Sequence, residues 1–137
     1  MPSPEFIDLV DYTLGEILSS MRPEDREFAQ SAEYLVDYRA MPHHKSMTGT
    51  PQDYQLLGMY EWEPKPKITV FEESLTHMSY MFGGIYNAVK EALNHEIWQH
   101  LFDLDHTKET EELGYIPAFA VDESGLELHQ WLLGDRR

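Results

Sequence analysis

Residues 89–102 read VKEALNHEIWQHLF and form the C-terminal part of a helix that the sequence predicts over residues 79–102. Apolar residues recur in this helix every four positions, which is the spacing of one face of an amphipathic helix. These residues are Ile85, Val89, Leu93 and Ile97. We therefore expect this segment to be the principal buried helix of the protein.

The N-terminus predicts a second amphipathic helix. Ser3 is suited to the N-cap and Pro4 to the first helical position. The apolar residues that follow at helical spacing are Phe6, Val10, Leu14, Ile17 and Leu18. A short helical turn is expected after Arg22-Pro23.

Three segments between these helices favour strands, at residues 33–39, 56–62 and 67–71. The last of them, KITVF, is rich in β-branched and apolar residues. Residues 40–53 contain proline and glycine and are expected to form an exposed loop. The order helix, strands, helix predicts an α+β fold in which helices pack against one face of a small sheet.

Composition restricts the classes of function. The chain has 137 residues, 25 acidic side chains against 10 lysines and arginines, and a formal net charge of -15, so phosphate backbones would be repelled. The absence of cysteine excludes disulfides, thiol catalysis and cysteine-bound metals, so any metal must be held by His, Asp or Glu. Without a signal peptide or an apolar span, we expect a cytoplasmic protein that binds neither nucleic acid nor membranes. The oligomeric state stays open.

Residues 95–106, HEIWQHLFDLDH, hold three histidines, two aspartates and one glutamate. In the zinc hydrolase motif His-Glu-x-x-His, histidines four apart share one helix face and one metal, while the glutamate acts as general base. His95 and Glu96 match the beginning of this motif. The residue four after His95 is Gln99, and the next histidine is His100.

The spacing of His95 and His100 leaves two structural alternatives. Residues four apart on a helix differ in direction by about 40°, and residues five apart by about 140°. A π-bulge would absorb the extra residue and let His95, His100 and His106 converge on a metal. In a regular helix Gln99 would offer only an amide oxygen, and Glu96 and His100 would face water on an acidic helix.

The sequence resembles the minimal-zincin family of metallopeptidase-like proteins in several segments, in the right order and spacing. They are LLGMYEWEP, KITVFEESL, VKEALNHEIWQHLFDLD and EELGY. The resemblance spans roughly residues 5–115 and sets residues 116–137 apart as a C-terminal extension. It implies an α+β fold with an N-terminal helix, a small mixed sheet and a helix that carries the metal motif.

The resemblance also implies zinc and site residues. His95 matches the first zinc ligand and Glu96 the general base. The second ligand falls on Gln99 without an insertion or on His100 with one, and the third falls on Asp105 or His106 respectively. Trp98 lies where the family usually has glycine.

Two hypotheses of function follow. In the first, the protein is a zinc-dependent metallopeptidase in which His95, His100 and His106 (with Asp105 as the alternative) bind Zn²⁺, and Glu96 deprotonates the metal-bound water that attacks a peptide substrate. In the second, the fold is kept as a non-catalytic binding or regulatory module for a peptide or protein.

Other candidates have weaker signals. The strand around Gly58 could pair with an extended peptide, or it could be an ordinary core strand with a bulge at Gly58. His43, His44 and His77 are expected to be surface histidines, and Tyr115 could donate a hydrogen bond to an oxyanion. The apolar tail after Gly125 predicts a short terminal helix that docks on the domain or on a partner.

Overall fold

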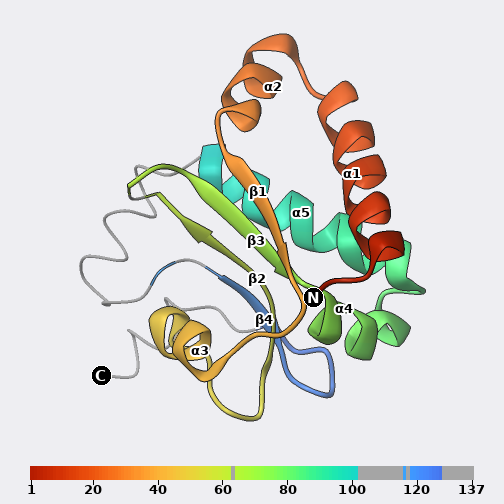
Figure 1. The fold of residues 1–137 in the computed structure, drawn as a ribbon, viewed down its shortest axis with the longest axis vertical. Coiled ribbons are helices and arrows are strands. Elements are labelled where there is room, and N and C mark those ends of the chain that lie inside the picture. The colour runs from red at the N-terminus through yellow and green to blue at the C-terminus, as the bar shows by residue number, and fades with distance from the viewer. Residues whose placement is uncertain (63, 102–115, 117, 128–137) are drawn as a thin grey trace.

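The computed structural model describes residues 1–62, 64–101, 116 and 118–127 (Figure 1). The helices of this part are α1 (Pro4–Ser19), α2 (Pro23–Gln30), α3 (Pro42–Thr48), α4 (Glu72–Met78), the 3₁₀ turn η1 (Ser79–Met81) and α5 (Ile85–Leu101). The strands are β1 (Glu33–Asp37), β2 (Gln55–Glu61), β3 (Lys67–Phe71) and β4 (Ala118–Val121). The predicted α+β fold is confirmed.

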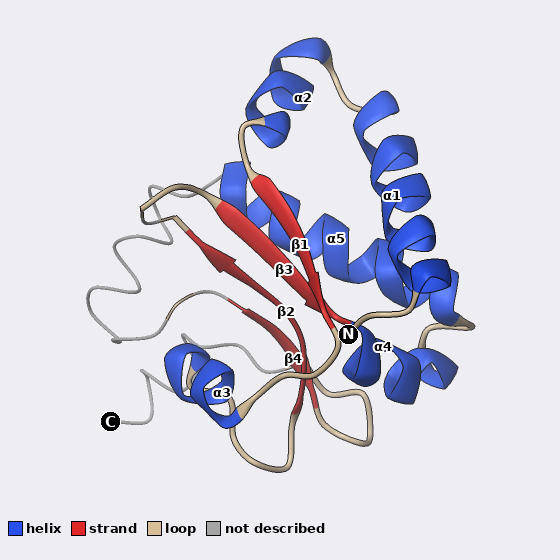
Figure 2. Cartoon of the chain, in the orientation of Figure 1, coloured by secondary structure: helices blue, strands red, loops and turns tan. Residues whose placement is uncertain are grey.

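The four strands form one mixed sheet in the order β1-β3-β2-β4 (Figure 2). Strand β1 is parallel to β3, and β2 is antiparallel to both β3 and β4. The three predicted strands are confirmed, and β2 and β3 are joined through the turn at Pro64-Lys65-Pro66. Residues 118–121, which lie beyond the region of family resemblance, supply the fourth strand of the sheet.

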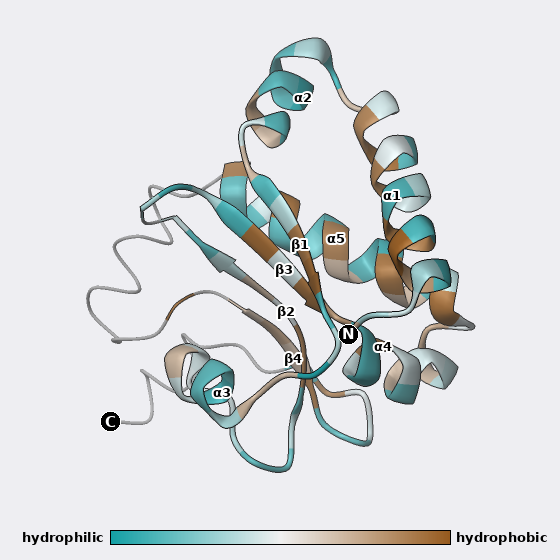
Figure 3. Cartoon of the chain, in the orientation of Figure 1, coloured by the Kyte–Doolittle hydropathy of each residue, from teal (hydrophilic) through white to brown (hydrophobic). Residues whose placement is uncertain are grey.

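Helix α1 begins where the sequence predicts. The Oγ of Ser3 accepts a hydrogen bond from the backbone N–H of Phe6 at 3.2 Å, and Pro4 occupies the first helical position. The buried face of α1 includes Phe6, Val10 and Ile17, and it packs against α5. Hydrophobic residues accordingly lie along the inner sides of both helices (Figure 3).

Helix α5 lies against the sheet, and the main hydrophobic core fills the space between them. Apolar side chains of α5 such as Val89 and Leu93 meet Ile68 and Val70 of β3 in this core. Helices α1 and α4 enclose the same core from other sides. The prediction that this segment is the principal buried helix is therefore confirmed.

The long helix begins later than predicted. Residues 72–81 form α4 and η1, and a turn at Gly83 and Gly84 separates them from α5. Both glycines have positive φ angles, 83° and 128°, which other residues rarely adopt. This pair therefore ends one helical segment and allows the next to begin at Ile85.

The segment predicted as an exposed loop contains a helix. Pro42 begins α3, and Gly49, with a φ of 68°, ends it as a left-handed C-cap. Helix α3 lies over the sheet face opposite α5, where the ring of His44 packs on Phe71 with centroids 5.0 Å apart. The helices α1, α4 and α5 enclose the main core on one face of the sheet, and α3 meets the opposite face at the His44–Phe71 contact.

None of the helices in the described part of the chain has the length and apolar character to cross a bilayer.

Candidate metal centre

The predicted π-bulge is wrong, because α5 is α-helical from Ile85 to Leu101 without interruption. Ala92, Glu96 and His100 follow one another at intervals of four, and all three are buried. An inserted residue would rotate His100 out of this buried stripe, so the regular helix preserves the packing. In the regular helix His95 and His100 point about 140° apart.

His100 lies in the core, between α2 and the sheet. It is 1% exposed, and its ring stacks on Phe28 with centroids 4.5 Å apart. Its Nε2 lies 3.0 Å from the carbonyl oxygen of Phe28 and 3.1 Å from the Oγ of Ser31, while Nδ1 lies 2.9 Å from the hydroxyl of Tyr60. A carbonyl oxygen can only accept, so Nε2 carries the proton and Nδ1 accepts from Tyr60. Both ring nitrogens are therefore engaged.

His95 lies near the opposite edge of the sheet, against β4. Its ring stacks on Phe119 with centroids 4.6 Å apart and an interplanar angle of 17°, and its side chain is 26% exposed. Nδ1 lies 3.2 Å from Oε1 of Glu96, and Nε2 lies 3.7 Å from Oε1 of Glu127. His95 therefore has carboxylate neighbours, whereas the ring of His100 meets a phenol, an alcohol and a carbonyl.

Glu96 is completely buried, and its Oε2 has no hydrogen-bond partner among the residues that the structure describes. Gly58 of β2 provides the space for it, since a Cβ at position 58 would lie 3.3 Å from Cγ of Glu96. Burial raises the pKa of Glu96, and the interaction with His95 offsets this only in part. Burial lowers the pKa of His95, but Glu96 and Glu127 outweigh it, so the net shift is upward. The pair thus retains protons to a higher pH than either group does in water.

Gln99 lies one turn after His95 on the same helix, and its Oε1 is also buried without a hydrogen-bond partner in the described part of the chain. His95, Glu96 and Gln99 are therefore neighbours on α5, and two of them hold unpartnered buried oxygens. Asp105 and His106 lie outside the described residues. Within the part of the chain that the structure describes, no group of three or more His, Cys, Asp or Glu side chains is placed to hold a metal ion.

The predicted three-histidine set does not fit a metal in this fold. His100 would have to leave the core and break bonds at both nitrogens before it could coordinate, and the regular helix directs it away from His95. The ungapped set fits in part, because His95 and Gln99 occupy positions four apart and the Oε1 of Gln99 lacks a partner. Zinc binding therefore stays a prediction.

The alternative readings of the other motifs are also resolved. Strand β2 pairs with β3 on one side and β4 on the other, so it offers no free edge to a peptide. Its register shifts between Leu56 and Gly58, which confirms a core strand with a bulge at this point. The prediction of peptide pairing along the strand at Gly58 is wrong.

The other histidines lie in separate surroundings. His44 accepts a hydrogen bond at Nδ1 from the backbone N–H of Met41 at 2.9 Å, and the ring of His43 packs on that of His44. His77 lies 3.3 Å from Glu123 in an exposed ion pair. Tyr115 lies outside the described residues, as does the tail beyond Glu127.

Sequence reasoning missed the residues that surround the two histidines. Phe28 and Tyr60 lie 72 and 40 positions from His100 along the chain, and no local spacing relates them to it. The neighbours of His95 include Phe119 of β4, which lies beyond the region of family resemblance. No protein-family model matches the chain, and a search of curated proteins finds no match either, so the likeness to minimal zincins rests on the quoted motifs alone.

Proposed function

We infer that this chain is a zincin-like domain that binds a partner and does not hydrolyse it. One observation carries the inference, namely that His100 is 1% exposed and has both ring nitrogens hydrogen-bonded within the core. A hydrolytic zinc site needs three strong protein ligands and an open position for water. Among the described motif residues, His95 alone remains as a nitrogen ligand, and Gln99 offers only an amide oxygen.

The expected partner is a peptide or protein with a positively charged surface. The net charge of -15 would accelerate encounters with such a partner and would disfavour acidic ones. Attraction of this kind weakens as salt screens the charges, so the affinity for the partner should fall as ionic strength rises.

A second candidate function, zinc-dependent peptide hydrolysis, is favoured by one side-chain oxygen each of Glu96 and Gln99 that has no hydrogen-bond partner among the described residues. Both are buried, which is energetically unfavourable unless something binds them. In this case His95, Gln99 and Asp105 would hold the metal, as the ungapped resemblance implies. Zinc would supply Lewis-acid activation of a bound water, and Glu96 would accept its proton.

Elemental analysis of the purified protein separates the two candidates. The non-catalytic domain should contain far less than one zinc per chain and cleave no peptide in a mixed peptide library. The variant Gln99→His should then take up zinc at least tenfold more tightly, because two imidazoles four apart on a regular helix share one face. Gln99→Asn is the matched control, since it keeps an amide and should leave zinc affinity unchanged.

One zinc per chain in the wild type, lost in His95→Ala, would overturn the binding-only inference. Peptidase activity that disappears in Glu96→Gln while zinc is retained would then establish the second candidate. His100→Phe should leave metal content unchanged under either candidate, because the ring serves the core.

A further inference from the structure

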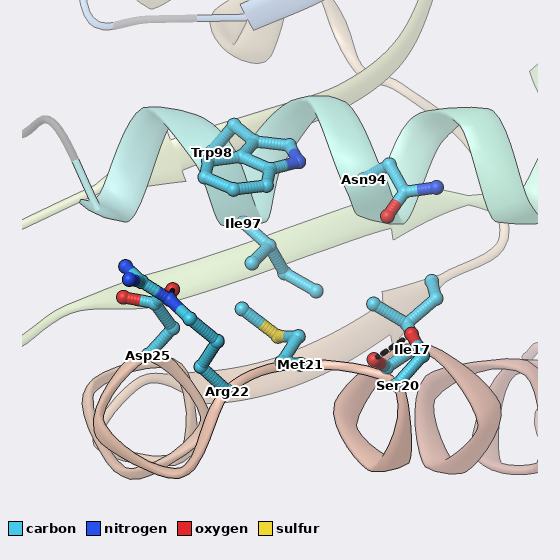
Figure 4. A pocket seen from close by; sticks show the side chains of 8 residues that line it. All are labelled: Ile17, Ser20, Met21, Arg22, Asp25, Asn94, Ile97 and Trp98. Atoms are coloured by element: carbon cyan, nitrogen blue, oxygen red, sulfur yellow. Dashed lines mark hydrogen bonds and ion pairs between the residues drawn. The ribbon is translucent and has the colours of Figure 1, made fainter.

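A hollow lies between the end of α1, the start of α2 and the outer side of α5 (Figure 4). It has a volume of about 290 Å³. Ile17, Met21 and Ile97 line it with apolar groups, while Trp98 of α5 faces Asp25 of α2 across it. It therefore combines an apolar interior, an aromatic wall and a carboxylate that is paired with Arg22, which also lines the hollow.

The wall formed by the α1–α2 connection is held in place by Arg26. Its Nε donates to the carbonyl oxygen of Leu18 at 2.7 Å, and its Nη2 donates to that of Met21 at 3.0 Å. These bonds satisfy carbonyl groups at the C-terminal end of α1 and fix the position of Met21. The hollow is thus formed before any ligand arrives, which reduces the entropy lost on binding.

The aromatic wall of the hollow is the side chain of Trp98. Trp98 is 48% exposed, although it lies on the principal buried helix. It also occupies the position at which the resembling family usually has glycine, so this departure from the motif builds the wall. Among aromatic side chains, the face of the tryptophan indole attracts organic cations most strongly.

The carboxylate opposite Trp98 has an exchangeable partner. Asp25 Oδ2 lies 3.0 Å from Nε of Arg22, and the two side chains are 25% and 73% exposed. Arg22 also has Glu24 within 3.8 Å. Because exposed ion pairs contribute little stability, Arg22 can remain with Glu24 while a ligand's cation takes its place beside Asp25.

We propose that this hollow binds an ammonium or guanidinium group carried on an apolar stem, with the stem against Met21 and Trp98 and the cation between Trp98 and Asp25. The proposal rests on the binding role inferred above and gives it a ligand class. A small amine and a lysine or arginine side chain of a partner protein share this chemistry. The acidic surface of the chain, with its net charge of -15, attracts either source.

The test is a titration of the full-length protein with n-hexylammonium, followed by the indole N–H resonance of Trp98 in NMR spectra, which Trp98→Phe identifies. Saturable binding that shifts this resonance is expected. Hexanol and hexanoate have the same stem without the cation and should bind at least about fivefold more weakly. A blocked lysine peptide, titrated in the same way, distinguishes a protein side chain from a free amine.

Two variants test the charge exchange. Asp25→Asn should weaken hexylammonium binding by at least about fivefold, whereas Asp8→Asn, the same change at an exposed site on α1, should alter it by less than about twofold. Arg22→Gln removes the competing cation and should strengthen binding, an effect that loss of structure would not produce.

Hexanoate binding as tight as that of hexylammonium would overturn the proposal, and so would weaker hexylammonium binding in Arg22→Gln. These outcomes do not depend on zinc content. The failure of this proposal is therefore distinguishable from the failure of the proposed function.

Discussion

The two histidines of the motif lie five positions apart on one helix, and they have opposite surroundings. His100 is 1% exposed and is held at both nitrogens by uncharged groups from α2 and β2 and the turn between α2 and β1. His95 is partly exposed at the edge of the sheet, beside two carboxylates. The difference teaches that a histidine in a metal-like motif takes its role from the elements that pack on it. One of these residues completes the core, and the other belongs to a buried pair that titrates.

Among the predicted changes in the free energy of unfolding, the largest is expected for His100→Ala. The substitution leaves a cavity against Phe28 and removes the bonds to Tyr60 and Ser31, so the free energy of unfolding should fall by about 2–4 kcal/mol. Urea denaturation followed by circular dichroism measures it. His95→Ala is the counterpart and should have a clearly smaller effect. Equal losses at the two positions would contradict the contrast between core and edge.

The next largest change in the free energy of unfolding is expected for Gly58→Ala, because Gly58 packs against Glu96 of α5. The new Cβ would lie 3.3 Å from Cγ of Glu96 and 3.3 Å from the backbone oxygen of Thr69, so overpacking should lower the free energy of unfolding by about 1–3 kcal/mol. The double variant Gly58→Ala with Glu96→Ala relieves one of the two contacts. Its loss should therefore be smaller than the sum of the single losses in a double-mutant cycle, and simple additivity would argue against this contact.

The pH dependence of stability should reveal the buried pair. Glu96 and His95 both have raised pKa values in the folded protein, so the folded state binds more protons than the unfolded state above the ordinary values of 4.5 and 6.5. The free energy of unfolding should therefore fall as pH rises through these windows. Glu96→Gln stays neutral and should flatten this decline, so its stability relative to wild type should increase with pH.

Urea denaturation at several pH values between about 5 and about 8 measures this slope. Glu27→Gln, at an exposed glutamate on α2 that contributes to the pKa shift of neither His95 nor Glu96, is the matched control and should keep the wild-type slope. A slope that Glu96→Gln leaves unchanged would show that the decline arises elsewhere.

The smallest effect is expected from Glu127→Gln. The carboxylate lies 3.7 Å from Nε2 of His95 and is partly exposed, so the free energy of unfolding should change by less than about 0.5 kcal/mol. The pKa of His95, followed by NMR titration, should nevertheless fall, because one of the groups that raise it is gone. An unchanged His95 pKa would assign the upward shift to Glu96 and Glu91 without Glu127.

Local signals predicted much of the fold. The Ser3-Pro4 start of α1 and the β-branched run of β3 were both identified, because caps and strand preferences act within a few residues. Helix α3 was missed because Pro42 and Gly49 look alike whether they mark a loop or the two ends of a short helix. Strand β4 was not among the predicted strands, since a strand of four residues becomes recognisable when it pairs with β2.

The sequence by itself determined the helical periodicity of residues 85–101, the acidic surface, and the presence of His95, Glu96 and Gln99 within two turns of one helix. It could not determine whether His95 and His100 lie on the same side of the helix, because a π-bulge and a regular helix are both compatible with the same sequence. Only the tertiary structure decided it. Phe28 and Tyr60, 72 and 40 positions away, hold His100 in the core and keep the helix regular, and such distant contacts exist only after the chain has folded.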